Sequence, residues 1–385
     1  MSALRRIVRY YPRAAVGDGG MTRAVRRWAD AVAALGPEVD IVFDGGEPPV
    51  ERGTARWVPL GHRGRPPVRL PIGLEQVLLG ADLLVIHSGW TAHGALAARQ
   101  ARRLGVPYLL EPRGAYDPHI FRRHDPWRRI FWTAAERRVV RGAAAIHVFF
   151  ESERPNLDTI GYRGPLVVVP NGVDSPAQPP WTGGGGYILF LGRFDPQHKG
   201  IDLLVRAVAR LSPTDRPAVR LCGPDRRGGR ARIVRLVSEL AVGRWVTVEP
   251  AVYGEPKRAL LTAADGFVYP SRWDACPNAV LEAVSLGVPT LCTPYPLGID
   301  LAGRGGALLA AADPDGLAAG IAALGDHRRA AGLGVAGAAA ARAGFAWTSV
   351  AESWLSQVRA VLDGSDASDA QRHAREDTDP EAFPG

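Results

Sequence analysis

Two acidic side chains, Asp274 and Glu282, flank the predicted start of a short helix and could bind a sugar joined to a nucleotide. The sequence over 270–291 predicts a strand end, a polar loop, a helix that begins at Pro277 and stops at Gly287, and another strand. A helix N-terminus presents unpaired N–H groups and a positive dipole end, which suit a phosphate. One carboxylate could then hold sugar hydroxyls and the other the ribose. A capping acid beside a solvated helix acid is the alternative.

Two basic side chains in the same half of the chain, Arg193 and Lys199, have a spacing that suits a diphosphate site. Arg193 follows a strand predicted over 187–192, and Lys199 precedes a helix predicted by an apolar stripe over 201–211. Both would point into one crevice, where two cations suit a diphosphate. Only two of the 47 basic residues are lysines, Lys199 and Lys257, which invites a specific explanation for each. A solvated arginine beside a helix-flanking lysine is the alternative.

Together these residues resemble the signature of glycosyltransferase family 4, the retaining nucleotide-sugar enzymes of the GT-B fold. The resemblance runs in order over roughly residues 5–362. It implies that Arg193 and Lys199 hold the donor phosphates during catalysis and that Glu282 is the second acid of the family's pair. Asp274 stands where the first acid is usually Glu, so the side chain is one methylene shorter, which bears on the identity of the sugar.

The resemblance implies further donor contacts outside these two motifs. A glycine-rich turn with Gly19 and Gly20 would approach the donor, although the residues alone also fit a plain strand–helix turn. Arg113 occupies a position where many members carry His, and a cation there could offset charge on the donor during catalysis. Tyr253 would lie beside the nucleotide base. The other expected donor contacts follow a strand or open the short helix: Gly223, Ala275, Cys276, Pro277 and Asn278.

Four residues that follow predicted strands in the first half of the chain are expected near the acceptor. His87 and Trp90 follow one strand, and Glu111 and Asp117 follow the next. Strand ends in parallel sheets feed the ligand crevice, and one of the two acids could activate the acceptor. For His87, packing or capping is the alternative. No Asp-x-Asp motif precedes a donor loop, so we expect neither a metal nor a cofactor, only a small-molecule donor and acceptor.

Repeated strand–helix pairs predict an α/β protein whose parallel sheets carry helices on both faces. The GT-B resemblance implies two doubly wound, Rossmann-like domains that face each other across a cleft. A stretch over 44–73, rich in Gly, Pro and Arg, predicts loops around one short strand. We expect an acceptor-side domain, a Pro/Gly-rich linker, a nucleotide-sugar-binding domain, a helix crossing back to the first domain, and a disordered polar tail, over 1–175, 176–186, 187–345, 346–362 and 363–385.

The composition is that of a globular protein with an uneven charge. The 385 residues are 46% hydrophobic and 22% charged, and the three cysteines have neither disulfide nor metal spacing. No apolar run is long enough for a secretion signal or a membrane span, so we expect a cytoplasmic protein. Residues 1–175 hold 25 Lys and Arg against 17 Asp and Glu, a net charge of +8, whereas the rest of the chain is balanced at 22 each.

This basic first half could contact an anionic surface at the inner face of the cell membrane, and a solvated arginine-rich surface is the alternative. The stretch over 120–141 mixes arginine pairs with aromatic residues. It could add to such a surface, or it could be an amphipathic helix whose aromatics join the core. No nucleic-acid-binding module is recognisable, so nucleic acid is not expected as a partner.

These expectations converge on a retaining glycosyltransferase that moves a sugar from a nucleoside diphosphate sugar to an acceptor hydroxyl. Polysaccharide or glycolipid assembly and natural-product glycosylation are both compatible with it. A non-catalytic sugar-nucleotide-binding protein is one alternative. A pyridoxal-phosphate phosphorylase of the same fold class is another, and it would need a Schiff-base lysine, for which Lys257 is the candidate beside Lys199.

Overall fold

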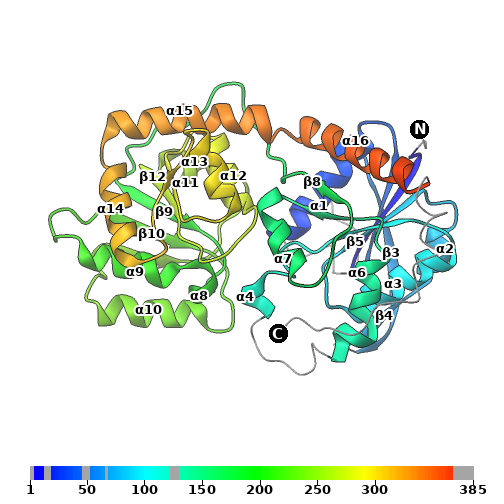
Figure 1. The fold of residues 1–385 in the computed structure, drawn as a ribbon. Coiled ribbons are helices and arrows are strands. Elements are labelled where there is room, and N and C mark those ends of the chain that lie inside the picture. Colours follow the sequence, from blue (N-terminus) through cyan, green and yellow to red (C-terminus); the bar gives the residue numbers. More distant parts are fainter. Residues whose placement is uncertain (1–3, 13–18, 46–52, 66–67, 122–129, 367–385) are drawn as a thin grey trace. The chain divides into compact units, whose positions relative to one another are not determined.

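The computed structural model describes residues 4–12, 19–45, 53–65, 68–121 and 130–366. The chain forms two compact units (Figure 1). The first unit combines Met1–Gly172 with Trp347–Gly385, and the second is the continuous segment Val173–Ala346. Residues 176–186, the expected linker, therefore lie inside the second unit.

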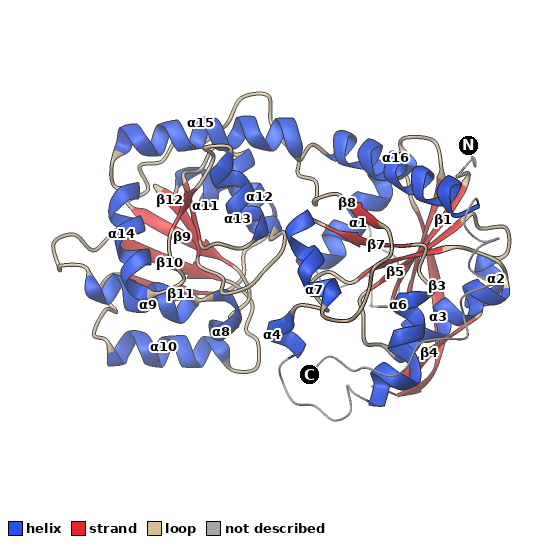
Figure 2. Cartoon of the chain, in the orientation of Figure 1, coloured by secondary structure: helices blue, strands red, loops and turns tan. Residues whose placement is uncertain are grey.

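The first unit is built on an eight-stranded sheet in the order β4-β3-β2-β1-β5-β6-β7-β8 (Figure 2). The β3–β4 pair is antiparallel, and the other neighbours are parallel. The strands are β1 (Arg6–Tyr11), β2 (Glu38–Asp44), β3 (Arg56–Arg65), β4 (Val68–Ile72), β5 (Leu83–His87), β6 (Tyr108–Glu111), β7 (Ala145–Val148) and β8 (Leu166–Val168).

Alternating side chains of these strands enter two cores, one on each face of the sheet. On one face α1 and α16 pack against the strands through Trp28 and Trp354, which are fully buried. On the other face α3 and α6 contribute small and branched side chains. The helical segments are α1 (Gly20–Ala33), α2 (Leu74–Leu78), α3 (Ala92–Arg103), α4 (Pro118–Phe121), a π-helix (Trp132–Glu136), α6 (Arg137–Arg141), a 3-10 turn (Glu151–Glu153), α7 (Arg154–Asp158) and α16 (Trp347–Asp366).

The prediction of loops around one short strand over 44–73 was wrong. This stretch forms β3 and β4, which pair as an antiparallel hairpin at the edge of the sheet. β3 pairs along β2, and the buried Asp40 on β2 binds the guanidinium groups of Arg6 and Arg56 on the flanking strands. Cross-strand pairing therefore holds a strand whose own residues, rich in Gly, Pro and Arg, do not favour one.

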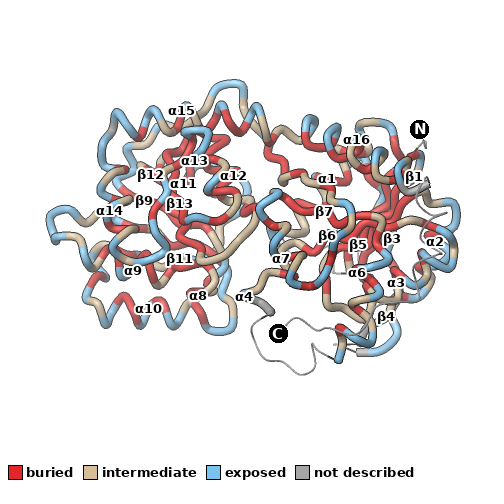
Figure 3. The backbone as a smooth tube through the Cα atoms, in the orientation of Figure 1, coloured by how far each residue is buried: buried red, intermediate tan, exposed pale blue. Residues whose placement is uncertain are grey.

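The second unit has a fully parallel six-stranded sheet in the order β11-β10-β9-β12-β13-β14. Figure 3 shows that its central strands are buried. The strands are β9 (Tyr187–Leu191), β10 (Ala218–Cys222), β11 (Val246–Glu249), β12 (Gly266–Tyr269), β13 (Thr290–Cys292) and β14 (Leu308–Leu309). The helices are α8 (Pro196–Lys199), α9 (Ile201–Arg210), α10 (Gly229–Glu239), α11 (Gly254–Ala263), α12 (Asn278–Ser285), α13 (Pro296–Gly303), α14 (Pro314–Leu324) and α15 (His327–Gly344).

Two helix boundaries differ from the predicted ones. α12 begins at Asn278, with Pro277 as its N-cap, and Gly287 takes the left-handed conformation just beyond its end. α16 runs to Asp366, so residues 363–366 belong to a helix and not to the expected disordered tail. The remainder of that predicted tail, 367–385, lies outside the described residues.

The predicted class of two doubly wound α/β sheets is confirmed, and each sheet has a point where the strand order reverses. In the first unit this point lies between β1 and β5, and in the second it lies between β9 and β12. Ligands of open α/β sheets bind at the carboxyl ends of the strands near such a point. The described part of the chain contains no helix that is long and apolar enough to cross a membrane.

Candidate functional site

Lys199 and Asp274, the predicted phosphate-binding cation and the first acid of the motif, form an ion pair in the second unit. Lys199 ends α8, beyond the carboxyl end of β9, and Asp274 lies in the loop that follows β12. Since β9 and β12 are neighbours at the reversal point, the two loops meet where ligands bind in such sheets. The side chains are 9% and 19% exposed, so the pair is sheltered without being sealed from solvent.

The loops that carry this ion pair are bound to each other through their neighbouring residues. The backbone carbonyl of His198 accepts hydrogen bonds from the Arg272 amide and the Ser271 hydroxyl, each at 3.0 Å. The His198 ring stacks on Trp273 with the ring centroids 4.9 Å apart and the planes within 4°. The residues just before Lys199 and just before Asp274 are therefore in contact, which preorganises the pair.

Two glycines allow the segments around the site to approach this closely. Gly200 has φ of 63°, and a Cβ there would lie 1.8 Å from the carbonyl oxygen of Pro270. A Cβ at Gly223 would lie 1.7 Å from the carbonyl oxygen of Gly192, at the end of the neighbouring strand. Neither position accepts a larger residue without moving backbone. Gly223, predicted as a donor contact, therefore has a packing role as well.

Tyr269, the last residue of β12, lies against the ion pair, and no sequence motif singled it out. Its hydroxyl donates to Asp274 Oδ2 at 3.1 Å, and its ring centroid lies 5.3 Å from Lys199 Nζ. Burial, reinforced by the Asp274 carboxylate, raises the pKa of the phenol well above its usual value, so the hydroxyl remains a donor. Burial also favours a neutral Asp274, but the Lys199 ammonium, together with His198 and the hydrogen bonds from Lys199 and Tyr269, outweighs burial and lowers the pKa of that carboxyl.

Arg193 adds a second positive charge near the Lys199–Asp274 ion pair. Arg193 follows β9 directly, and it is exposed. Burial lowers the pKa of His198 to about 4, and the charges of Lys199 and Arg193 act in the same direction. His198 is therefore neutral at pH 7, and it contributes stacking and a backbone acceptor to the site without adding charge.

The start of α12 carries the predicted phosphate-binding residues. No side chain caps this helix, whose N-cap is Pro277 and whose first residue is Asn278. The amide of Ala275 donates to Asp274 Oδ1 at 3.1 Å, and Cys276 is 6% exposed. The positive end of the α12 dipole therefore begins three residues beyond the ion-paired acid.

Glu282, the second acid of the motif, forms an ion pair with Lys257. Lys257 lies within α11, which begins at Gly254, and not at the start of a helix as predicted. Tyr253 is the N-cap of α11 and is 47% exposed, so its ring is accessible at the predicted base position. The two lysines of the chain thus each bind one acid of the motif.

In the first unit, His87 and Glu111 are buried in one ionic cluster. Arg9 Nη2 lies 2.7 Å and His147 Nδ1 lies 2.9 Å from Glu111 Oε1. Arg113 Nη2 donates to Oε2 at 3.0 Å. His87 Nδ1 lies 2.9 Å from Oε2 without the alignment of a hydrogen bond, so we treat that contact as electrostatic. Glu111 is 1% exposed, at the carboxyl end of β6.

The protonation of this cluster follows from its burial and its charges. Burial favours a neutral Glu111, but Arg9, together with His87 and Arg113, outweighs burial and holds the pKa of the carboxyl well below its usual value. Burial lowers the pKa of His87 to about 4 despite the attraction of Glu111. An ionised, buried and fully partnered Glu111 does not fit the predicted acceptor base. Glu111 instead holds the guanidinium groups of Arg9 and Arg113 in place, and we call it the anchor of this cluster.

Arg113, the predicted catalytic cation of the first unit, is held by this anchor. Its backbone has φ of 49°, which non-glycine residues rarely adopt. Its guanidinium lies 5.6 Å from the Phe149 ring centroid, and its side chain is 7% exposed. The predicted action of Arg113 on donor charge stays a prediction, but its geometry depends on Glu111.

Trp90 lies in a strained loop held by a buried carboxylate, Glu136, that no sequence motif indicates. Ser88 and Trp90 have φ of 79° and 61°. The Trp90 amide donates to Glu136 Oε1 at 2.8 Å, and the Tyr116 hydroxyl donates to the same oxygen at 2.5 Å. Burial raises the pKa of Glu136. This carboxyl lies in the π-helix, an irregularity that is frequent at functional sites.

The other predicted residues of the first unit lie nearer the surface. Gly20 begins α1 with Gly19 as its N-cap, and both are exposed. Asp117 Oδ1 accepts a hydrogen bond from the His119 amide at 2.8 Å and lies 2.9 Å from the His119 ring nitrogen Nδ1. Asp117 is thus engaged at the start of α4, apart from the buried Glu111 cluster.

The basic, aromatic stretch over 120–141 is described only in part, because residues 122–129 lie outside the described ranges. Trp132 is 4% exposed and packs against Trp90 with the ring centroids 5.8 Å apart. This aromatic residue therefore belongs to the core, as the amphipathic-helix alternative predicts.

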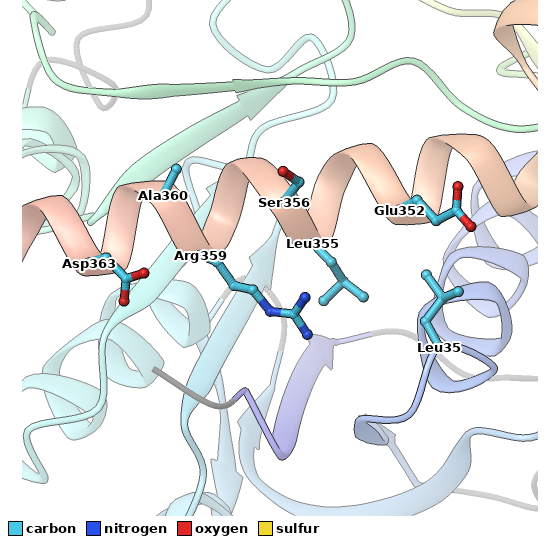
Figure 4. A pocket seen from close by; sticks show the side chains of 7 residues that line it. All are labelled: Leu35, Glu352, Leu355, Ser356, Arg359, Ala360 and Asp363. Carbon is cyan, nitrogen blue, oxygen red and sulfur yellow. The ribbon is translucent and has the colours of Figure 1, made fainter. Parts of the chain in front are cut away.

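A pocket of about 490 Å³ lies on the first unit beside α16 and the end of α1. None of the predicted site residues lines it. Figure 4 shows its lining, formed by Leu35, Glu352, Leu355, Ser356, Arg359, Ala360 and Asp363.

Comparisons with known proteins match two stretches of this chain to glycosyltransferase family models. Residues 19–172 match the model of a glycosyl transferase 4-like domain, and residues 185–327 match the glycosyl transferases group 1 model. The chain is 28% identical over 309 residues to D-inositol 3-phosphate glycosyltransferase of Frankia alni, covering 72% of this chain and 74% of that one.

Two solved structures share the fold at low sequence identity. Sucrose-phosphate synthase from Thermosynechococcus elongatus superposes with a TM-score of 0.74 at 22% identity, over 94% of this chain and all of that one. HepE of Anabaena, solved with UDP and glucose, superposes with a TM-score of 0.72 at 14% identity, again over 94% of this chain and all of that one.

Proposed function

Since this chain belongs to the family 4 glycosyltransferases and has the GT-B fold, we propose that its second unit binds a nucleoside diphosphate sugar and its first unit the acceptor. The Lys199–Asp274 ion pair at the β9–β12 reversal point, beside the uncapped start of α12, carries this proposal. The ion pair and the start of α12 together place cations, helix amides and a carboxylate at the edge of the sheet where ligands bind.

The chemical requirement is the departure of the nucleoside diphosphate. Breaking the bond between the sugar and the phosphate moves negative charge onto the diphosphate oxygens. Arg193, Lys199 and the first turn of α12 would stabilise that charge, because fixed cations and dipoles aimed at developing charge supply the largest catalytic effect in many enzymes. Asp274 would accept a hydrogen bond from a sugar hydroxyl while it keeps Lys199 in position.

We propose that transfer retains the configuration of the sugar, with attack of the acceptor hydroxyl on the face that the diphosphate leaves. A departing phosphate oxygen would then take the acceptor proton, which fits a first unit whose Glu111 is already fully partnered. The role fits polysaccharide or glycolipid assembly or natural-product glycosylation. A pyridoxal-phosphate phosphorylase is less well supported, because both lysine ammonium groups form ion pairs with carboxylates.

We expect one class of activated sugar to raise the melting temperature well above the others in a screen of UDP-, GDP-, ADP- and TDP-sugars. A ligand at 100 times its Kd stabilises the native state by about 2.7 kcal/mol through mass action. The product formed with that donor should keep the donor's anomeric configuration, which the coupling constant of the anomeric proton reports. A protein that responds to none of these donors would contradict the proposal, and an inverted product would contradict retention alone.

We further propose that a basic surface of the first unit contacts an anionic membrane. α3 and α6 are neighbours, and neither contains an acidic residue. None of the exposed arginines on them forms an ion pair with a described acidic side chain. This basic surface consists of Arg99, Arg102, Arg103, Arg138 and Arg141.

Replacing Arg99, Arg102 and Arg103 together by Gln should weaken binding to vesicles that contain anionic lipid by more than tenfold. Each basic residue near such a surface contributes about 1 kcal/mol, and the attraction falls as salt rises. Cosedimentation with phosphatidylglycerol vesicles at two salt concentrations measures the effect, with neutral phosphatidylcholine vesicles for comparison.

The matched control removes the same charge from the second unit by replacing the exposed Arg206, Arg232 and Arg235 with Gln. It should bind vesicles as the unaltered protein does. Equal loss in both triple variants, or no preference for anionic lipid, would contradict a specific basic surface.

A further inference from the structure

Lys199 is held by two neighbouring side chains, and its ammonium keeps donors for a ligand. Nζ donates to Asp274 Oδ2 and lies 5.3 Å from the ring centroid of Tyr269. A lysine ammonium carries three N–H donors, and no other group in the described part of the chain accepts one of them. The contacts with Asp274 and Tyr269 therefore decide where a ligand oxygen can bind to this ammonium.

Tyr269 fixes the carboxylate that receives the ammonium. Its hydroxyl donates to Asp274 Oδ2 at 3.1 Å, and the same oxygen accepts from Lys199. The amide of Ala275 donates to the other oxygen, Oδ1, also at 3.1 Å. Both carboxylate oxygens are thus held within the protein, which opposes rotation of Asp274 away from Lys199.

The ring of Tyr269 is itself fixed by the core of the second unit. The residue is 3% exposed, and its ring stacks on Phe190 of the neighbouring strand β9 with the centroids 5.7 Å apart. The Tyr295 ring packs against it edge-on, with the centroids 6.0 Å apart. The lysine side chain, by contrast, is a flexible four-carbon stem. Tyr269 therefore supplies the rigid support that the stem of Lys199 lacks.

Packing alone does not account for a tyrosine at this position. Phenylalanine would fill the same space, as Phe190 and Phe267 do beside it. Burial of a hydroxyl costs free energy unless a hydrogen bond offsets it. Within the described residues the Tyr269 hydroxyl has one acceptor, Asp274 Oδ2, so its presence in the core is linked to the ion pair.

We propose that Tyr269 is a positioning residue for diphosphate binding, one whose hydroxyl and ring hold the Asp274–Lys199 pair so that the ammonium meets a phosphate oxygen. This inference rests on the proposed function, because it requires a nucleoside diphosphate in the second unit. Tyr269 acts through Asp274 and Lys199 and does not itself contact the reacting atoms.

The test compares the Kd values of UDP, GDP and ADP with those of UMP, GMP and AMP, measured by calorimetry. The unaltered protein should bind the diphosphate of its best base about 10- to 100-fold more tightly than the monophosphate, the value of hydrogen bonds to a charged group. In Tyr269→Phe, which removes only the hydroxyl, this preference should fall by about three- to tenfold, the value of one hydrogen bond. The Kd of the monophosphate should change by less than about twofold, whereas general damage to the unit would weaken both ligands alike.

The matched control is Tyr295→Phe, which removes a buried hydroxyl from a ring that packs on Tyr269. The Tyr295 hydroxyl donates to Cys292 Sγ at 3.0 Å and not to the ion pair, so this variant should keep the preference.

A second comparison removes the Tyr269 hydroxyl from the Lys199→Met variant. There Tyr269→Phe should have no further effect on the preference, because substitutions that act through one group are not additive.

The outcomes separate this inference from the function on which it rests. An unchanged preference in Tyr269→Phe, an equal fall in Tyr295→Phe, or a full further fall in the Lys199→Met variant would overturn the inference. So would an unaltered protein that binds a diphosphate no more tightly than its monophosphate. Each of these results leaves nucleotide binding, and with it the proposed function, intact. Failure to bind any of the six nucleotides would overturn both.

Discussion

Replacing Lys199 by Met should lower kcat by about 100- to 1,000-fold, the cost of removing one group that stabilises transition-state charge. The ammonium is held against Asp274 and beside the uncapped start of α12, where the leaving diphosphate would gather charge. The exposed Arg193→Ala should cost less, by about tenfold or more, because water can replace part of its effect. Initial rates with the preferred donor, at saturating donor and acceptor, measure both.

Lys199→Met also leaves Asp274 without its cation. The loss of phosphate stabilisation must therefore be separated from the repulsion that an unpaired Asp274 carboxylate would exert on the diphosphate. The double variant Lys199→Met with Asp274→Asn removes both charges. It should remain as slow as the single variant if Lys199 acts on the diphosphate. Recovery of activity in the double variant, or a kcat within about threefold of the unaltered enzyme for Lys199→Met, would refute the phosphate assignment. Arg210→Met on α9, an exposed position that pairs with Asp315, is the matched control.

Replacing Glu111 by Ala should lower the free energy of unfolding of the first unit by about 3–5 kcal/mol, the usual cost of removing one partner from a buried ion pair. Arg9 has a fully buried side chain, and without Glu111 it would keep its charge with no carboxylate beside it. The guanidinium already lies 6.0 Å from the Trp28 ring and 5.5 Å from the Trp354 ring. Urea unfolding followed by tryptophan fluorescence therefore reports on this region directly.

Glu151→Ala supplies the comparison, because Glu151 pairs with Arg154 at the surface of the same unit. Its loss should cost below about 1 kcal/mol, as for other exposed ion pairs. Equal destabilisation in the two variants would mean that the Glu111 cluster is not an anchor of the first unit. Since the protein has two units, the transition that moves in Glu111→Ala should be assigned before a free energy is derived from it.

Hydrophobic periodicity and turn residues in the sequence predicted most of the helices and strands. The apolar runs at β5, β9 and β12 predict buried parallel strands, and the stripe along α9 predicts its packed face. The β3–β4 hairpin was missed because its stability comes from pairing with β2 and from the ion pairs of Asp40. No local pattern within the stretch itself encodes partners on another strand of the sheet.

In the candidate site too, local motifs predict which residues take part, whereas only the fold shows the contacts between them. Arg193, Lys199, Asp274 and Glu282 were predicted from motif residues that follow a strand, flank a helix or lie one turn into it, and their roles stay predictions. The contacts that orient them were not, since Lys257 reaches Glu282 across two helices. Tyr269 also could not be assigned to Asp274, because only the fold brings the loop back over the strand end. The choice of lysine over arginine at two positions was the one sequence signal that pointed to such a contact.

The helix α16 has a consequence for how the chain folds as it is made. It completes the core of the first unit with Trp354, and its Gln357 binds the backbone of Val168 at the edge strand β8. On the ribosome, this face of the first sheet is therefore covered by α1 alone, without α16, until residues 347–366 have left the exit tunnel. The second unit is continuous and can close as soon as residue 346 has emerged. Translation thus delivers most of the first unit first but completes its core last.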